Sequence, residues 1–106
     1  MDNYVINTIR ICIKASKYSF GETMLYDIKS KKVFVVVIAN DAGNANKKKV
    51  IDKCNCFKIP YFVLMSKSEL MSIFNRNISS FGITDVNLAQ KLINNIRKGG
   101  IDYGNK

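Results

Sequence analysis

The apolar residues of the chain fall into two kinds of run. In some segments they recur every three or four residues, which predicts helices with one buried face. Residues 33–39 are instead continuously apolar, which predicts a strand covered on both faces, and residues 61–64 form a second, shorter apolar run. The predicted helices cover residues 4–15, 20–30, 45–57, 67–75 and 86–98, and the predicted strands cover residues 33–39, 61–64 and 78–83.

Polar residues mark where several of these segments begin. Ser19 and Ser66 each precede a glutamate by three residues, a spacing typical of a capping box at a helix N-terminus. Asp85 is expected to cap the last helix, and the two glycines at 99–100 end it. We therefore predict a single domain over residues 1–98 and a frayed, flexible C-terminal tail over residues 99–106.

The alternation of helices and strands predicts an α/β fold. Such alternation is typical of a mostly parallel sheet with helices on both faces. The connections are short, and no linker, internal repeat or low-complexity segment is evident.

The composition adds a strong positive charge. The 106 residues include 17 Lys and Arg against 8 Asp and Glu, which gives a formal charge of +9. An excess of this size favours a polyanionic partner, nucleic acid first and an anionic membrane second. The charge is weaker evidence for such a partner than its size suggests, because most of the basic residues are lysines in a Lys- and Asn-rich chain. An AT-rich genome also produces this composition.

Few residues offer chemistry. The chain has no histidine, which removes the commonest general base and the commonest zinc ligand. Cys54 and Cys56 form an isolated C-x-C pair without further ligands nearby. With Cys12 they are expected to be buried or half-buried thiols on helices, in a reducing, cytoplasmic compartment. The longest apolar run, residues 33–39, is too short to cross a bilayer. We therefore predict no enzyme activity, no cofactor, no metal and no membrane partner.

Two further features have alternative interpretations. The lysine run at 47–49 is either a solvated helix face or a phosphate-contacting surface. Gly43 lies in a turn between a strand and a helix, which suits either an ordinary turn or a site for a small phosphorylated ligand at residues 43–45.

Several short stretches resemble a family of RNA-binding ribosomal proteins. They cover residues 9–21, 35–42, 47–54, 59–61, 66–70 and 81–85, in that order along the chain. Together they resemble the superfamily of kink-turn-binding ribosomal proteins, the archaeal and eukaryotic large-subunit proteins seven-Ae and thirty-e. The chain looks closest to their short bacterial branch, the YlxQ-like proteins. The resemblance implies a three-layer α/β/α sandwich, which we expect to hold a central, mostly parallel four-stranded sheet.

The resemblance also implies a function and a site. The proteins of this superfamily bind RNA without catalysis: the N-terminus of the helix after a glycine, here Gly21, enters a widened groove of the RNA. Lys67 matches a lysine of the family, and residues 78–80 fall in the loop that packs against a flipped-out base. We expect a monomer that binds structured RNA, such as a kink-turn or ribosomal RNA. The candidate RNA-binding residues are Lys14, Lys17, Ser19, Gly21, Glu22, Thr23, Asn40, Asp41, Lys67, Ile78, Ser79 and Ser80.

Four positions depart from the family pattern. Thr23 and Met24 stand where an Asn-Glu pair reads guanines, Asp27 stands where a lysine contacts phosphate, and Gly43 replaces an acidic residue. A methionine cannot form the paired hydrogen bonds that discriminate a guanine edge, and an aspartate repels phosphate. The alternative hypothesis is therefore a protein-interaction module that kept the fold and lost kink-turn base recognition.

Overall fold

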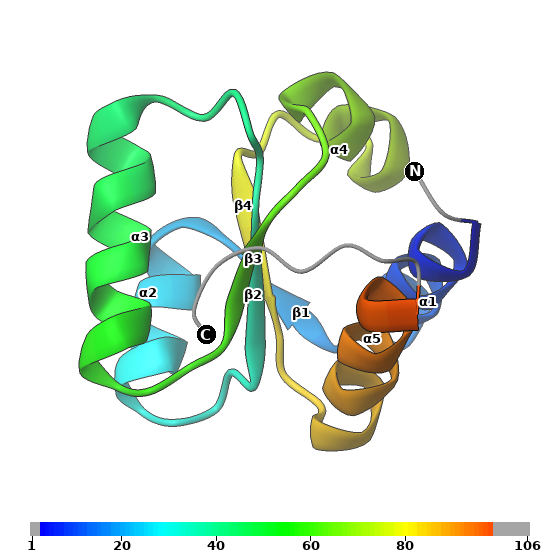
Figure 1. Ribbon diagram of the computed structural model, residues 1–106, viewed down its shortest axis with the longest axis horizontal. Coiled ribbons are helices and arrows are strands. Elements are labelled where there is room, and N and C mark those ends of the chain that lie inside the picture. Colours follow the sequence, from blue (N-terminus) through cyan, green and yellow to red (C-terminus); the bar gives the residue numbers. More distant parts are fainter. Residues whose placement is uncertain (1–2, 99–106) are drawn as a thin grey trace.

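The computed structural model describes residues 3–98 as a sheet between two groups of helices (Figure 1). Helices α2 and α3 cover one face of the sheet, and α1, α4 and α5 cover the other. The predicted α/β sandwich is therefore observed, whereas the predicted tail at 99–106 lies outside the described residues. The elements are α1 (Asn3–Lys14), β1 (Tyr18–Ser19), α2 (Gly21–Lys29), β2 (Val35–Ile38), α3 (Asn44–Cys56), β3 (Tyr61–Val63), α4 (Lys67–Phe74), β4 (Ser80–Ile83) and α5 (Val86–Lys98).

The sheet is mixed, so the prediction of a mostly parallel sheet is wrong. The strand order is β1-β4-β2-β3, and only β2 and β3 pair in parallel. β4 runs antiparallel to both of its neighbours, with Ser80 opposite Ile38 and Gly82 opposite Ser19. The direction of β4 follows from the position of α4, which lies at the end of the sheet where β3 ends (Figure 1). The chain therefore enters β4 from that end and has to run back along β2.

Ser19 does not cap α2, and the capping box predicted there is wrong. Ser19 belongs to the two-residue strand β1, where its buried hydroxyl has no hydrogen-bond partner among the described residues. The residue before α2 is Phe20, whose backbone is extended and whose side chain accepts no hydrogen bond. Ser19 pairs with Gly82 of β4 instead of capping α2. A pattern of nearby residues does not reveal such a pairing between distant strands.

The caps predicted for two other helices are confirmed. The Ser66 hydroxyl accepts a hydrogen bond from the Glu69 amide at 3.1 Å, and the Glu69 carboxylate accepts one from the Ser66 amide at 2.9 Å. The Asp85 carboxylate accepts a hydrogen bond from the Leu88 amide at 2.9 Å in the first turn of α5. Both helices therefore begin where the sequence indicated.

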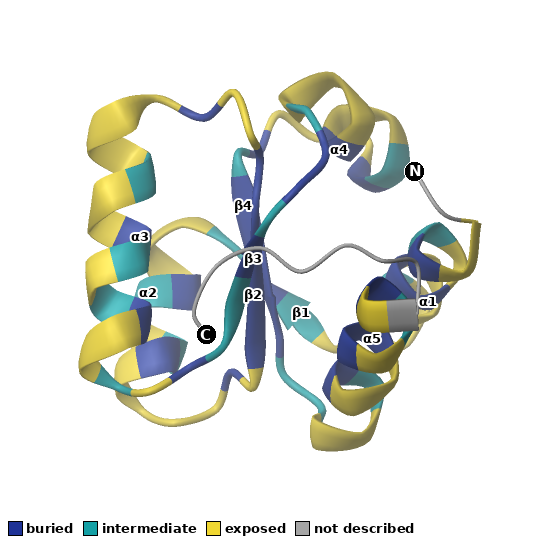
Figure 2. Ribbon diagram, in the orientation of Figure 1, coloured by how far each residue is buried: buried dark blue, intermediate teal, exposed yellow. Residues whose placement is uncertain are grey.

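The core lies on both faces of the two central strands. Every residue of β2 and β4 is buried, and for β2 this burial explains the apolar residues at 35–38 (Figure 2). Gly82 of β4 lies against Met24 of α2 and against Val33, which follows that helix: a Cβ atom there would come 2.8 Å from Val33 Cγ1 and 3.3 Å from Met24 Cγ. The absence of a side chain at Gly82 thus sets how closely α2, with its exposed N-terminus, packs on the sheet.

Two of the three cysteines are buried, as predicted. Cys12 and Cys54 are buried thiols on helices, whereas Cys56 is exposed, so the prediction of a buried or half-buried thiol is wrong at that position. Across residues 3–98 no helix is both long and apolar enough to cross a membrane, and no cluster of three potential metal ligands occurs.

Candidate functional site

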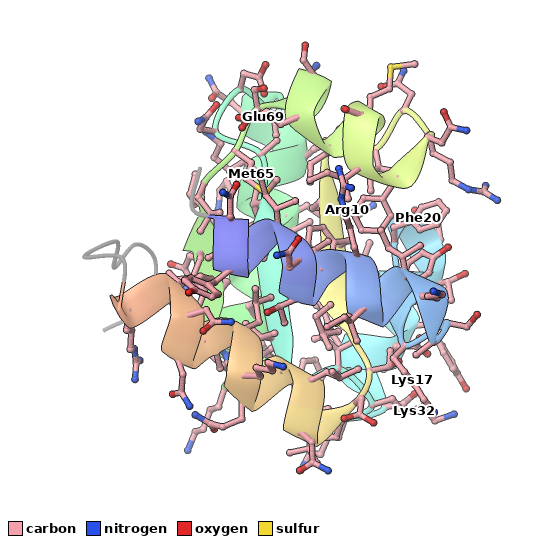
Figure 3. All side chains as sticks on the ribbon, turned by 90° about the vertical axis from the view of Figure 1, so that its right-hand side faces the viewer. Arg10, Lys17, Phe20, Lys32, Met65 and Glu69 are labelled. Atoms are coloured by element: carbon pink, nitrogen blue, oxygen red, sulfur yellow. The ribbon has the colours of Figure 1, made fainter. Side chains whose placement is uncertain are left out.

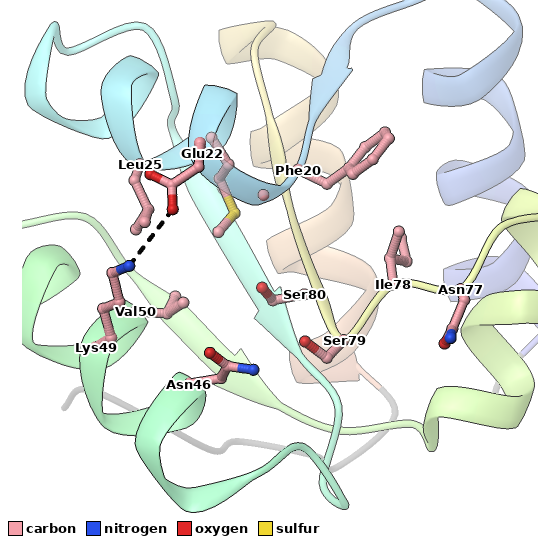
Figure 4. A pocket seen from close by; sticks show the side chains of 12 residues that line it. Phe20, Glu22, Leu25, Asn46, Lys49, Val50, Asn77, Ile78, Ser79 and Ser80 are labelled. Atoms are coloured by element: carbon pink, nitrogen blue, oxygen red, sulfur yellow. Dashed lines mark hydrogen bonds and ion pairs between the residues drawn. The ribbon is translucent and has the colours of Figure 1, made fainter.

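A hollow of about 280 Å³ opens at the N-terminus of α2, and we call it the main hollow (Figure 4). It lies at the edge of the sheet where β1 and β2 end and β4 begins, since Ile38 pairs with Ser80 and the Ala39 amide donates to the Ser79 carbonyl at 2.8 Å. Its walls come from α2, α3 and the loop before β4. The residues that line it are Phe20, Gly21, Glu22, Met24, Leu25, Asn46, Lys49, Val50, Asn77, Ile78, Ser79 and Ser80.

Gly21 turns the chain from β1 into α2. Its φ of +65° lies in the left-handed region that favours glycine, although a Cβ atom there would meet nothing within 4 Å. The left-handed backbone therefore favours glycine at this position, whereas neighbouring atoms would leave room for a side chain. Because no side chain caps α2, its first amide groups are left for solvent or a ligand. Such an end carries partial positive charge and suits an anion.

Lys49 contributes a cation to the opposite wall of the main hollow. Its Nζ lies 3.5 Å from Glu22 Oε1, so the pair joins α3 to the first turn of α2 (Figure 4). The side chains are 56% and 88% exposed, which makes the attraction weak in water and leaves Lys49 able to turn to another anion.

The rest of the lining mixes apolar and hydrogen-bonding groups. Val50 and Ile78 are buried and give an apolar surface, while Asn46 and Asn77 are exposed amides on opposite sides. A planar group with polar edges would find both kinds of contact here. Gly21, Glu22, Ile78, Ser79 and Ser80 are the predicted site residues that the structure brings together in the main hollow.

A second group of predicted residues meets at the ends of β2 and β3. The Asp41 carboxylate accepts a hydrogen bond from the Lys67 amide at 2.8 Å, so it caps α4 together with the Ser66 box. The Asn40 carbonyl accepts a hydrogen bond from Lys47 Nζ at 3.0 Å. Asn40, Asp41 and Lys67 thus share the edge of the sheet on which the main hollow lies.

Four predicted residues lie away from the main hollow. The Lys17 carbonyl accepts a hydrogen bond from the Thr84 amide at 3.0 Å, at the far end of β4. Figure 3 shows Lys17 at the opposite end of the molecule from Glu69. Lys14 lines a shallow depression between α1 and α4. Ser19 and Thr23 line a side hollow on the other side of Phe20.

Sequence reasoning missed the contribution of α3. Asn46, Lys49 and Val50 lie three and four residues apart, so the helical period places them on one face, and that face lines the main hollow. Lys48 points elsewhere and pairs with Asp52 at 2.8 Å. The three lysines of the run therefore differ: Lys47 donates to the Asn40 carbonyl, Lys48 pairs with Asp52 in solvent, and only Lys49 lines the main hollow. The helical period could have indicated this division.

The departures from the family pattern have different structural outcomes. Met24 is 1% exposed and packs in the core below the main hollow. Asp27 is half-buried and lies with Lys31 and Lys32 around a different hollow. Gly43 is the residue before α3 and offers no side chain.

The family model and the related proteins that match this chain point to the same family. The model of the Ribosomal protein L7Ae/L30e/S12e/Gadd45 family matches residues 6–93. RNA-binding protein YlxQ of Enterococcus faecium is 36% identical over 87 residues, covering 81% of this chain and 84% of that protein. RNA-binding protein YlxQ of Bacillus subtilis is 33% identical over 86 residues, covering 76% and 82%. A solved protein of unknown function from Bacillus halodurans C superposes with a TM-score of 0.85 over 91% of this chain and 99% of its own; at 23% identity it supports the fold alone.

Proposed function

This chain belongs to the L7Ae/L30e/S12e/Gadd45 family of ribosomal proteins, in its YlxQ-like branch, and from this premise we propose that it binds structured RNA without catalysis. The observation that carries the proposal is the uncapped N-terminus of α2, which opens into the main hollow opposite Lys49. Both features attract a phosphate, and the net charge of +9 strengthens the attraction at long range.

The main hollow suits RNA in two ways. The α2 amides and Lys49 contact phosphates, which position the RNA without reading its sequence. An unpaired base fits against Val50 and Ile78, with Asn46 and Asn77 available to its polar edges. Lys67, Asn40 and Asp41 extend the surface along the same edge of the sheet.

The RNA we propose is a structured one, a kink-turn-like or ribosomal RNA, bound by a cytoplasmic monomer that needs no cofactor. Met24 is buried and has no hydrogen-bonding group for a guanine edge, so affinity comes mainly from phosphates, from shape and from unpaired bases. Lys14 and Lys17 contact phosphate only if the RNA extends beyond the main hollow, along α1 and β1.

Titration of fluorescently labelled RNA tests the proposal. The protein is titrated against a kink-turn RNA, a plain duplex of equal length and a single strand, at about 50 mM and about 200 mM salt. We expect saturable binding that is tightest for the kink-turn RNA and weaker at the higher salt. Undetectable binding to all three RNAs at the lower salt would contradict the proposal.

A protein-interaction module is the second candidate. Its support is the buried Met24 together with exposed apolar side chains on α1 and α4, namely Tyr4 (72% exposed), Ile11 (44%) and Met71 (54%). Replacing Lys14, Lys17 and Lys67 together by Glu separates the two candidates. Loss of RNA affinity with unchanged folding supports RNA binding. The protein-interaction module is supported if a partner protein is still captured by the triple variant and is no longer captured by Met71→Ser.

A further inference from the structure

Arg76 lies over the ring of Phe20 beside the main hollow. The guanidinium carbon is 5.4 Å from the centroid of the ring, although 56 positions separate the two residues along the chain. Arg76 follows Asn75, whose left-handed backbone (φ 59°) ends α4 and starts the loop that leads to β4. Arg76 is exposed and forms no salt bridge with any residue from 3 to 98.

The ring of Phe20 is held by aromatic residues behind it. Tyr18 stacks on it with centroids 6.1 Å apart and planes 10° from parallel. Tyr18 also meets the edge of Phe74 at 5.3 Å, and Phe74 contacts the buried Phe81 at 4.8 Å. Phe20 is thus the outer member of an aromatic series anchored in the core, and its orientation is fixed before any ligand arrives.

Phe20 also separates two hollows. On one side it lines the main hollow, and on the other it lines the side hollow with Ser16, Ser19 and Thr23. Figure 4 shows its ring directed away from Glu22 and Lys49, toward the outside of the site. A strand of RNA that passes from the main hollow across the N-terminus of α2 toward β1 has to cross this ring.

We propose that Phe20 and Arg76 form a stacking site for one unpaired nucleobase, next to the base held in the main hollow. The inference rests on the proposed RNA binding and adds a second base position to it. An aromatic face and a planar guanidinium both stack on any base, so this position is tolerant of sequence. Because Arg76 has no carboxylate partner among the described residues, its charge is also available to the phosphate of the same nucleotide.

The test uses a kink-turn RNA whose unpaired nucleotides are replaced one at a time by 2-aminopurine, whose fluorescence falls when it stacks. We expect the wild-type protein to quench one of these positions. Phe20→Leu keeps an apolar side chain but removes the aromatic face, so we expect an affinity about 5-fold to 100-fold weaker and loss of the quenching. Arg76→Lys keeps the charge but not the planar group, so we expect weaker quenching with an unchanged salt dependence.

Arg97→Lys is the matched control, because Arg97 is exposed on α5, on the other face of the sheet from α2 and α3. Thermal unfolding of each variant separates binding from folding, and Arg76→Lys keeps the test decisive if Phe20→Leu unfolds. Two results would overturn the stacking site and leave the proposed function standing. One is unchanged quenching and affinity in Arg76→Lys and in any folded Phe20→Leu protein. The other is RNA binding by the wild-type protein without quenching at any position. No RNA binding by the wild-type protein would refute the proposed function, and the stacking site with it.

Discussion

Replacing Lys49 by Gln should weaken RNA binding without unfolding the protein. The change removes one charge from the wall of the main hollow. The only ion pair it breaks among the described residues joins Lys49 to Glu22 at 3.5 Å, between two exposed side chains. Exposed pairs of this kind contribute about 0–1 kcal/mol, so the free energy of unfolding should fall by less than about 1 kcal/mol.

The effect on RNA binding follows from counterion release. Each phosphate neutralised by a lysine steepens the dependence of log K on log salt by about 0.7–0.9. Losing one such contact should make that slope shallower by the same amount and should weaken binding about five- to eightfold near 0.1 M salt. The difference should shrink as the salt concentration approaches about 1 M.

Lys48→Gln provides a matched control for this prediction. It removes the same charge one residue away, from a side chain that hydrogen-bonds Asp52 at 2.8 Å on the solvated side of α3. This hydrogen bond and the charge of Asp52 raise the pKa of Lys48, so the control residue is charged in the wild-type protein. Anisotropy titrations over a series of salt concentrations compare the three proteins. Equal slopes for the two variants would mean that net charge alone matters and would refute the placement of Lys49 at a phosphate.

Three further predictions concern the stability of the fold that holds the site. Gly82→Ala should lower the free energy of unfolding by about 1–3 kcal/mol in urea titrations, because its Cβ would lie 2.8 Å from a stiff valine side chain. Ser66→Ala should cost about 1 kcal/mol by the same measurement, because α4 loses its cap. Burial raises the pKa of Cys12 from 9.0 to about 11 and that of Cys54 to about 12. Both thiols therefore ionise earlier in the unfolded chain, so stability should fall as pH rises above 9, and a thiol reagent at pH 8 should label only Cys56 in the folded protein.

Local patterns predicted the helices of this protein well. The Ser66–Glu69 box and the Asp85 cap join residues three positions apart, so their spacing is visible directly in the sequence. The continuous apolar run at 33–39 likewise marked the buried strand β2, which is shorter, at 35–38. The short strand predicted at 78–83 begins two residues before β4.

Long-range pairing could not be predicted in the same way. Strand β1 exists because Ser19 pairs with Gly82, far along the chain, and this pairing overrode a capping box that looked complete. The reversed direction of β4 depends on how α4 packs, which alternation of elements does not encode. The resemblance likewise named Gly21 and residues 78–80 as candidate site residues, and the structure places all of them at the main hollow. Lys49, Phe20 and Arg76 became candidates only once the structure placed α3 and the loop after α4 around the same hollow.

Chemical-shift mapping of backbone amides during titration with a kink-turn RNA tests the central claim most directly. We predict that the largest shifts fall on residues 20–25, 46–50 and 76–80, and that residues 87–97 of α5 stay nearly unchanged. Shifts centred on α1 and α5, or no shifts at RNA concentrations that saturate an established kink-turn binder, would contradict the assignment of RNA binding to the main hollow.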